Sequence, residues 1–450
     1  MASRWVEVPL EQLKAQTKSA FAMGPFGSKI KAENFTTAGV PVIKGGNLNA
    51  TYLDESDFDF LTQEKADELE SAKARRLDIV ITHRGTLGQV GLIPEDSKYK
   101  EYVVSQSQLK MSFDIKRVDP YFVYYFLKSP LGQSRLLSNA SQVGVPAIAQ
   151  ALTSLRAIKI PIPENRSEQV HISRVLRSLD DKIDINRRIN QTLEAMAQAI
   201  FKSWFVDFDP VKAKIAAIGE GQDPLRAAMR TISGKTDAEL DQMSHERLDQ
   251  VAATAALFPD AMGELGLGDI PLGWEFKRVG ELIELAYGKA LKSADRKEGS
   301  VPVYGSGGIT GYHNEALVPH GAIIVGRKGT VGSLYWEDKS FFPIDTTFYV
   351  KPKAVPMIYC FYAMQTLGLE KMNTDAAVPG LNRENVYRLE LVKPTPEILN
   401  AFDGLIGQMR RVMRSNKIAS QSLAELRNTL LPKLLSREIS VETLMNEVAQ

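Results

Sequence analysis

The chain has 450 residues, of which 44% are hydrophobic and 24% are charged. This composition is typical of an ordinary globular protein with two or three domains. Its 55 Lys and Arg residues nearly balance its 54 Asp and Glu residues, so the chain is too weakly basic to hold DNA by charge alone. A single cysteine, Cys360, excludes an internal disulfide, and the N-terminal stretch lacks the apolar segment of a signal peptide. These features predict a cytoplasmic protein and argue against secretion and membrane spanning.

Residues 1–163 predict a mixed and mostly β module. A strand followed by a glycine-rich loop comes first, in GVPVIKGGNLN (39–49). A strand, a basic-Gly-Thr-x-Gly turn and a second strand follow in RLDIVITHRGTLGQVGLI (76–93), which is the pattern of a β-hairpin. A Ser/Gln stretch then leads into a strand in YVVSQSQLKMSF (102–113), and PYFVYYFLKS (120–129) predicts a short buried helix.

The same order of elements returns in residues 274–396. The matching stretches are SVPVYGSGGITGYHN (300–314), HGAIIVGRKGTVGSLYW (320–336), FPIDTTFYVKP (342–352) and PMIYCFYAMQT (356–366). Both copies also end alike, because VPAIAQALTSLRAIKIPIP (145–163) and VPGLNRENVYRLELVKPTP (378–396) share a Val-Pro start and a Pro-x-Pro end. A repeat this long indicates two duplicated domains rather than a solenoid.

A long amphipathic helix is predicted after each copy, over residues 164–206 and 397–440. With Lys182 and Asn186 filling the gaps, the first helix follows a 3-4 heptad alternation at Ile172, Val175, Leu179, Ile189, Leu193, Met196 and Ile200. The second helix follows the same alternation at Phe402, Leu405, Met409, Val412, Asn416, Ala419, Leu423, Leu426 and Leu430. Asn186 and Asn416 fall at matching positions of these seams.

A seam this narrow needs another helix to bury it. We favour antiparallel pairing of the two helices with each other, because a buried Asn pair would specify their register. The alternative is that each helix packs only on its own domain. The residues expected to pair the helices are Asn186, Leu193, Met196, Asn416, Leu423 and Leu426.

Between the helices, residues 207–273 hold twice as many acidic as basic residues, whereas the flanking segments are mildly basic. This segment is interpreted as a partly helical connector without a core of its own. The sequence therefore predicts an α+β protein with a pseudo-two-fold internal repeat, in which two mixed, mostly β domains are joined by two long antiparallel coiled-coil helices. The expected boundaries are 1–163 and 274–396 for the domains, 164–206 and 397–440 for the helices, 207–273 for the connector and 441–450 for a tail.

No catalytic constellation is recognisable in the sequence. There is no Pro-Pro dipeptide of the kind found in the active-site loop of amino-methyltransferases, and GKT (234–236) lacks the upstream glycine of a phosphate-binding loop. The five His residues show no metal-ligand spacing. We therefore expect a binding protein without catalytic residues, a metal or a cofactor of its own.

The repeated loops carry side chains that suit DNA. Arg84, Arg327 and Lys328 lie at the hairpin tips, where guanidinium groups and backbone amides can meet a phosphate or a guanine edge. For any single residue the alternative is an ordinary solvated loop, and the argument depends on the loops taken together. The candidate DNA-binding residues are Lys44, Asn47, Arg84, Thr86, Gln106, Gln108, Ser306, Tyr312, Asn314, Arg327, Lys328 and Thr330.

With these features the chain resembles the specificity subunits of type I restriction-modification systems. The resemblance covers nearly the whole length. It rests on the two Gly-Thr-x-Gly hairpins, the Pro-x-Pro ends, the heptad helices, and the stretches SWFVDFDPVKAK and LFPDAMGELGLGDIPLGW of the connector. It implies a non-catalytic subunit whose domains each read one half of a bipartite site on double-stranded DNA. Family domains vary in sequence with their target, so no individual base-reading residue can be transferred.

The resemblance also implies partners. The helices would act as a spacer and a docking platform for two methyltransferase (modification) subunits, which methylate adenine with S-adenosylmethionine. Restriction subunits that use ATP and Mg²⁺ would complete the complex. Two other functions remain compatible with the sequence: a specificity module of another two-gene methylase-nuclease system, and a protein scaffold that does not bind DNA. Neighbouring genes would separate the first, and chromatography on DNA would separate the second.

Overall fold

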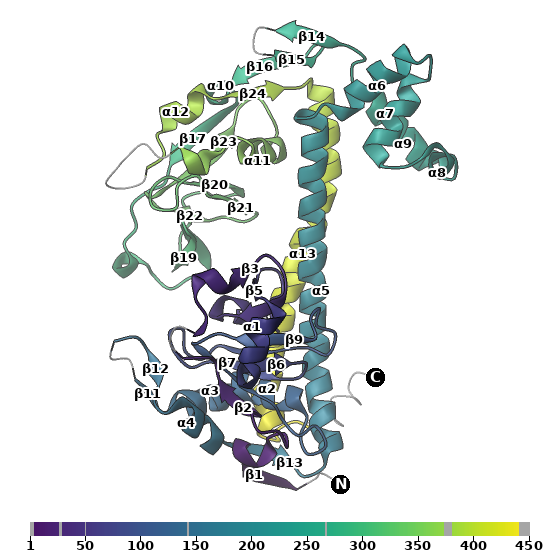
Figure 1. Ribbon diagram of the computed structural model, residues 1–450. Coiled ribbons are helices and arrows are strands. Elements are labelled where there is room, and N and C mark those ends of the chain that lie inside the picture. The colour runs from purple at the N-terminus through teal and green to yellow at the C-terminus, as the bar shows by residue number, and fades with distance from the viewer. Residues whose placement is uncertain are drawn as a thin grey trace. The chain divides into compact units, whose positions relative to one another are not determined.

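The computed structural model describes residues 4–26, 29–49, 51–141, 144–265, 268–372 and 380–440. The chain forms two units (Figure 1), one made of Met1–Arg187 with Lys417–Gln450 and one made of Arg188–Asn416. The expected tail, 441–450, and the second Val-Pro pair, 378–379, lie outside the described residues. Within the described ranges, no helix is both long and apolar enough to cross a membrane.

The first module contains two larger sheets and two separate strand pairs. Its predicted hairpin forms β7 (Ile79–Thr82) and β8 (Val90–Leu92), in an antiparallel sheet of order β2-β10-β7-β8. A second sheet, of order β3-β5-β4-β9-β6, contains β4 and β9 as a parallel pair. The remaining strands are β1 (Trp5–Pro9), β2 (Phe21–Met23), β3 (Phe35–Thr36), β4 (Val40–Ile43), β5 (Asp59–Leu61), β6 (Lys73–Arg75), β9 (Glu101–Val104), β10 (Gln108–Met111), β11 (Ala140–Ser141), β12 (Ala147–Ile148) and β13 (Lys159–Pro163). β1 pairs with β13, so the start of the module lies beside its exit.

The aromatic stretch after the second sheet forms the short buried helix that its sequence predicts, α2 (Pro120–Lys128). The Asp119 carboxylate accepts the Tyr121 N–H at its start, and Ser129 ends it while capping the following helix, α3 (Pro130–Leu137). A Cβ on Gly132 would lie 1.8 Å from the Phe126 carbonyl oxygen, so only glycine permits this tight succession of helices. The other helices of the module are α1 (Gln63–Glu68) and α4 (Ala151–Ala157).

The second module repeats this architecture. Its antiparallel sheet has the order β17-β23-β20-β21, a second sheet contains the parallel pair β18 and β22, and β16 pairs with β24 as β1 pairs with β13. The strands are β16 (Glu275–Arg278), β17 (Ile283–Tyr287), β18 (Val301–Gly305), β19 (Gly308–His313), β20 (Ala322–Gly326), β21 (Leu334–Glu337), β22 (Phe342–Pro343), β23 (Thr347–Pro352) and β24 (Glu390–Lys393). The helices are α10 (Val279–Leu282), α11 (Met357–Gln365) and α12 (Arg383–Arg388). The predicted internal repeat is therefore a repeat of sheet topology.

The two long helices are α5 (Arg166–Phe205) and α13 (Pro396–Leu435), each 40 residues long. α13 begins at Pro396 because a proline loses no helical hydrogen bond in the first turn. In each unit the helices lie side by side and antiparallel (Figure 1). In the first unit the Asn186 amide donates to Ser420 at 3.2 Å, and in the second the Asn416 amide donates to Asn190 at 2.9 Å.

The buried seam of the second unit differs in phase from the predicted heptad. On α5 the inward side chains include Asn190, Ala197 and Phe201, whereas Met196 is 46% exposed. On α13, Phe402 and Ile406 are buried and Val412 is 48% exposed. On α13 every second inward position thus lies one residue later than the sequence predicts, and on α5 Ala197 and Phe201 replace the expected Met196 and Ile200.

The first unit shows the same shift. Leu176 of α5 is fully buried whereas Val175 is half-buried, and on α13 Arg427 turns inward whereas Leu426 is 47% exposed. Leu193 and Leu423, which both phases share, are half-buried. The pairing positions expected at Met196 and Leu426 are therefore replaced by their successors. The physical reason is that the seam is filled by small and polar residues that bond across it, which an apolar pattern does not reveal.

An ion pair inside the seam ties the first module to the helices. Asp180 of α5 is 1% exposed, accepts the Tyr125 hydroxyl of α2 at 2.8 Å and is paired with the Arg427 guanidinium of α13. All three elements thus converge on one carboxylate. Arg410 of α13 lies 3.9 Å from Glu194 of α5 in the second unit, so in both places the acid belongs to α5 and the base to α13.

Asp180→Ala is expected to lower the free energy of unfolding by about 3 kcal/mol, because it removes the buried carboxylate that accepts from Tyr125 and pairs with Arg427. The matched control is Asp184→Ala on the same helix. Its carboxylate lies 2.8 Å from the Arg187 guanidinium three residues along the same helix, a contact worth about 0.5 kcal/mol. Urea unfolding of the full chain measures both. Equal losses in the two variants would contradict a structural role for the Asp180 contacts.

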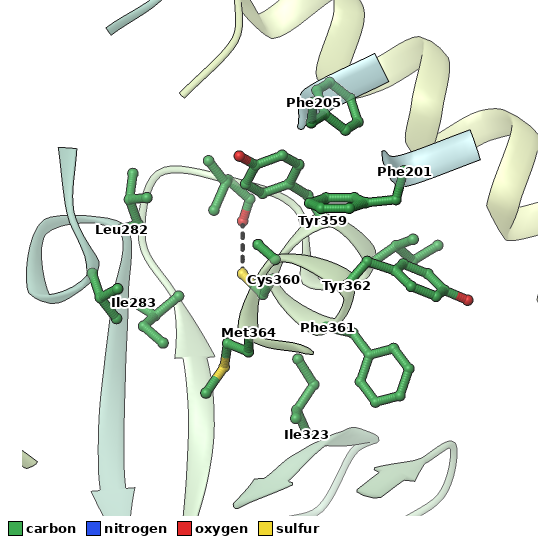
Figure 2. Close-up of a cluster of buried hydrophobic side chains, with 14 of the residues drawn as sticks. Phe201, Phe205, Leu282, Ile283, Ile323, Tyr359, Cys360, Phe361, Tyr362 and Met364 are labelled. Atoms are coloured by element: carbon green, nitrogen blue, oxygen red, sulfur yellow. Dashed lines mark hydrogen bonds between the residues drawn. The ribbon is translucent and has the colours of Figure 1, made fainter. Parts of the chain in front are cut away.

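Each unit buries a module together with the ends of both long helices. In the second unit, Phe201 and Phe205 of α5 pack at 5.5 and 5.3 Å, ring centre to ring centre, against Tyr359 of α11 (Figure 2). Phe402 of α13 joins the same cluster. Cys360 lies within it, and burial raises the pKa of its thiol to about 12, so the thiol is inert at neutral pH.

The connector is more structured than its composition indicates. It contains α6 (Asp209–Gly219), α7 (Pro224–Ser233), α8 (Asp237–Asp241) and α9 (His245–Ala256), followed by the hairpin β14 (Met262–Leu265) and β15 (Gly268–Pro271). Ala228, Met229, Leu240 and Ala255 form a small buried cluster between the helices. The expectation of a connector without a core therefore needs correction, because the three short helices α7, α8 and α9 together bury side chains that none of them could bury alone.

Candidate nucleic-acid interface

Four loops of the first module meet at its Gly-Thr-x-Gly turn. We name them the glycine loop (44–49), the hairpin tip (83–89), the Ser/Thr loop (105–108) and the exit loop (145–150). Within the tip, the Gln89 amide donates to the Gly45 carbonyl at 3.0 Å, and the His83 N–H donates to Ser107 at 2.9 Å. The Ile148 N–H donates back to the His83 carbonyl at 2.9 Å. The tip is thus bonded to all three other loops.

The second module joins its glycine loop (305–308), hairpin tip (327–333), Ser/Thr loop (344–347) and exit loop (380–383) by the same bonds. The Ser333 hydroxyl donates to the Ser306 carbonyl at 2.6 Å, in the place of Gln89 and Gly45. Arg327 N–H donates to Thr346 at 2.9 Å, and the Leu381 N–H donates to the Arg327 carbonyl at 2.8 Å. The repeated sequence therefore builds one loop arrangement twice, with different side chains on it.

Glycines make these tips possible. Gly85 and Gly329 have φ angles of 94° and 83°, a left-handed region that side chains rarely adopt. A Cβ on Gly332 would lie 2.3 Å from the carbonyl carbon of Leu369, so the second tip also needs glycine for close packing. The conformation presents the basic residue before each Gly-Thr to solvent. Arg84 and Lys328 occupy this position, and both are exposed.

The sequence-predicted residues fall into three groups. Eight have exposed side chains on the loops or the adjacent strand: Lys44, Arg84, Thr86, Gln106, Tyr312, Asn314, Lys328 and Thr330. Ser306 and Arg327 are half-buried. Asn47 and Gln108 are buried. The Lys44 ammonium also forms an ion pair with Asp59 and lies 5.0 Å from the centre of the Phe35 ring, so it already has two partners within the module.

Asn47 and Gln108 hold the loops rather than face solvent. The Asn47 carbonyl oxygen accepts the Lys44 N–H at 2.9 Å while its amide donates to the carbonyls of Asp54 and Asp57. The Gln108 amide donates to the Thr82 hydroxyl at 3.2 Å, and its oxygen accepts from Ser105. Both side chains are saturated inside the module. Among the DNA-binding candidates, Asn47 and Gln108 are therefore the two whose side chains are buried and bonded within the module.

The exit loops hold residues that the sequence analysis overlooked. Gln150 and Arg383 each follow by two positions the residue that bonds the hairpin tip, Ile148 or Leu381. The shared Val-Pro and Pro-x-Pro pairs of these stretches indicate only where each module ends. The register of the repeat, which aligns Ile148 with Leu381, is the signal that could have found them.

Among the residues that the structure describes, no group of three or more His, Cys, Asp or Glu side chains is placed to hold a metal ion. The exposed side chains of the loops and the adjacent strand include hydrogen-bond donors such as Gln106 and Asn314, cations such as Arg84 and Lys328, and the aromatic ring of Tyr312. These groups suit the phosphates and base edges of nucleic acid.

Comparison with known proteins places the chain in a family. The family model described as the type I restriction modification DNA specificity domain matches residues 24–195 and 271–398, which is more than half of the chain. The type I restriction enzyme HindI specificity subunit of Haemophilus influenzae is 29% identical over 382 residues, which cover 76% of this chain and 83% of that protein. The MjaIX specificity subunit of Methanocaldococcus jannaschii is 20% identical over 406 residues, 81% of this chain and 78% of that protein.

The fold has a known counterpart as well. A crystal structure of the type I restriction-modification system S subunit from M. genitalium matches 96% of both chains with a TM-score of 0.53 at 18% identity, which is a likeness of fold. The family match spans both modules and their four-loop arrangements. The chain therefore belongs to the family of type I restriction-modification DNA specificity proteins.

Proposed function

We propose that the chain is the DNA-recognition subunit of a type I restriction-modification complex, in which each module reads one half of a bipartite site on double-stranded DNA. The observation that carries this proposal is the loop arrangement that both modules share. Two modules that recognise different half-sites need the same backbone arrangement of loops, on which different side chains contact the DNA. Arg84 with Gln106 in the first module, and Lys328 with Thr330 in the second, are the exposed side chains proposed to contact DNA.

We also propose that the long helices dock two methyltransferase subunits. Their exposed apolar side chains lie beside the seam: Ile185, Ile418 and Leu426 in the first unit, and Ile189, Met196, Leu405 and Val412 in the second. Exposing apolar side chains of this kind to water is unfavourable, and burying them under a partner helix lowers the free energy. In this proposal the partners bind S-adenosylmethionine, and restriction subunits that join them use ATP and Mg²⁺. This chain contributes no catalytic residue.

Reconstitution tests the proposed function directly. The purified chain, mixed with DNA and labelled S-adenosylmethionine, is expected to transfer no methyl group. Adding the methyltransferase encoded beside its gene should give transfer at one bipartite sequence and nowhere else, because recognition resides in one protein and chemistry in the other. Transfer by this chain alone, or transfer by the mixture without sequence preference, would contradict the proposal.

A further inference from the structure

An exposed tyrosine stands beside the hairpin tip of the second module. Tyr287 is the last residue of β17, is 49% exposed and lies 4.9 Å from the Phe348 ring, centre to centre. The next two residues bond to the Ser/Thr loop and to the end of the preceding strand β22, because the Gly288 N–H donates to the Thr347 carbonyl and the Lys289 N–H donates to the Pro343 carbonyl. Tyr287 therefore belongs to the four-loop region, although it lies outside the repeated motifs of the sequence.

Two guanidinium groups share this ring. Arg327 of the tip lies 5.0 Å from the Tyr287 ring centre and 5.7 Å from that of Phe348, and Arg383 of the exit loop lies 5.1 Å from Tyr287. Arg327 is further held by a bond to the Asp345 carbonyl at 3.0 Å. Stacking fixes the plane of a guanidinium while leaving most of its N–H groups free to donate. Two cations are thus held on one aromatic platform.

The charge around the platform is mostly positive. Lys289 and Lys328 are exposed and flank the same Ser/Thr loop. The nearby acids are Asp345, whose carboxylate is exposed, and Glu384, which approaches Arg383 Nε at 3.4 Å. Like charges held this close repel one another unless an anion lies between them. The arrangement is therefore suited to an anionic group with several acceptor oxygens.

The first module has the same three positions without the charge. Met23 pairs with Leu109 where Tyr287 pairs with Phe348, and His83 bonds the Gln106 carbonyl at 3.1 Å where Arg327 bonds that of Asp345. Gln150 stands in the place of Arg383, two residues after the bond to the tip. These three residues line an open pocket of about 600 Å³ together with Arg84 of the hairpin tip, which corresponds to Lys328 of the second module. Burial lowers the pKa of the His83 ring and the neighbouring Arg84 lowers it further, so both favour the uncharged form of the ring.

We infer that Tyr287, Arg327 and Arg383 form a binding site for a phosphate of the DNA backbone in the second module, for which the first module has an uncharged counterpart. The inference rests on the proposed function, since it names the part of the DNA that this region holds. A phosphate contact orients the module on the duplex and carries no sequence information. The second module accordingly supplies a salt-sensitive contact that the first lacks.

Arg383→Gln tests the site, because it places there the residue that the first module carries. The full chain with its methyltransferase partner is titrated with a labelled duplex that bears its methylated sequence, and with an unrelated duplex, over a series of KCl concentrations. One lost phosphate contact reduces the slope of log affinity against log salt by about one. We expect that reduction on both duplexes, with binding at low salt weaker by several-fold. Arg383→Lys should keep the slope, because it keeps the charge.

Arg388→Gln is the matched control. Arg388 is the exposed last residue of the same helix, α12, so the variant removes the same charge away from Tyr287. It should leave the slope unchanged. Equal slopes for Arg383→Gln, Arg388→Gln and the unchanged chain would overturn the inference and leave the proposed function standing. A changed methylation sequence with an unchanged slope would overturn it too, since Arg383 would then read a base. Failure of the unchanged chain to prefer its own duplex would instead reject the proposed function.

Discussion

Exchanging residues 1–163 for the corresponding module of another family member is expected to replace one half of the methylated sequence and leave the other half intact. The reason is that each module has its own sheets, its own four loops and its own core. Among the residues that the structure describes, the bonds given above for the loops of the second module lie within residues 274–396, outside the exchanged segment. Long-read sequencing of methylated bases in a host that carries the hybrid gene measures both half-sites at once.

The exchanged module has to keep the hydrogen bonds that the first module makes with α5. Asp119 N–H donates to Gln169 of α5 at 3.0 Å, the Asp119 carboxylate accepts from Ser173, and Tyr125 bonds Asp180. A donor module with Asp and Tyr at these places is therefore the suitable choice. The reciprocal exchange of residues 274–396 serves as the control and should change only the other half-site. A hybrid in which both half-sites change together would show that the modules do not read independently.

Lengthening both long helices is expected to lengthen the unread gap between the half-sites. α5 and α13 each continue from one unit into the other, and in the proposed function they are the spacer between the two DNA-reading modules. Duplicating four residues after Arg187 and four after Lys417 places both insertions between the Asn186–Ser420 and Asn190–Asn416 contacts. Four residues add about 6 Å of helix. That length corresponds to about two base pairs at about 3.4 Å each.

Two controls separate this effect from general disturbance. A four-residue duplication after Gly221, in the turn between α6 and α7, should leave the gap unchanged, because that turn lies outside the long helices. Duplication in α5 alone should destabilise the chain, since its seam residues would face the wrong partners on α13. Methylated-base sequencing provides the measurement for each. A gap that stays constant in the doubly lengthened variant would reject the helices as the spacer.

The architecture could be predicted from sequence because its signals are local. Glycine turns, alternation of apolar residues and Pro-x-Pro ends specify the hairpins and the module boundaries within short windows. Because the same sequence pattern occurs in both modules, the prediction for each module supports the prediction for the other. The heptad phase could not be obtained in this way. Positions such as Met196 and Val412 look like core by hydrophobicity, whereas the inward positions are Asn190, Ala197 and Met413, which pack or bond across the seam.

The site could be predicted as a set of loops but not residue by residue. Sequence shows that Asn47 and Gln108 are polar, but not that neighbouring carbonyls and hydroxyls saturate them inside the module. Conversely, Tyr287 and Arg383 lie 96 positions apart in the chain, and only folding brings them to 5.1 Å. Contacts between residues that lie far apart in the sequence depend on the tertiary structure, and local sequence patterns do not reveal them.

The division of the chain into units has a consequence for the order in which a newly made molecule can be completed. The second unit is one continuous stretch, Arg188–Asn416, whereas the first combines the beginning of the chain with Lys417–Gln450. Leu431, Leu434 and Leu435 of α13 are buried in the core of the first module beside Leu176 of α5. During synthesis this surface stays uncovered until the last helix has left the ribosome. The module that is translated first is therefore finished last, and a chain interrupted anywhere before α13 leaves that surface uncovered.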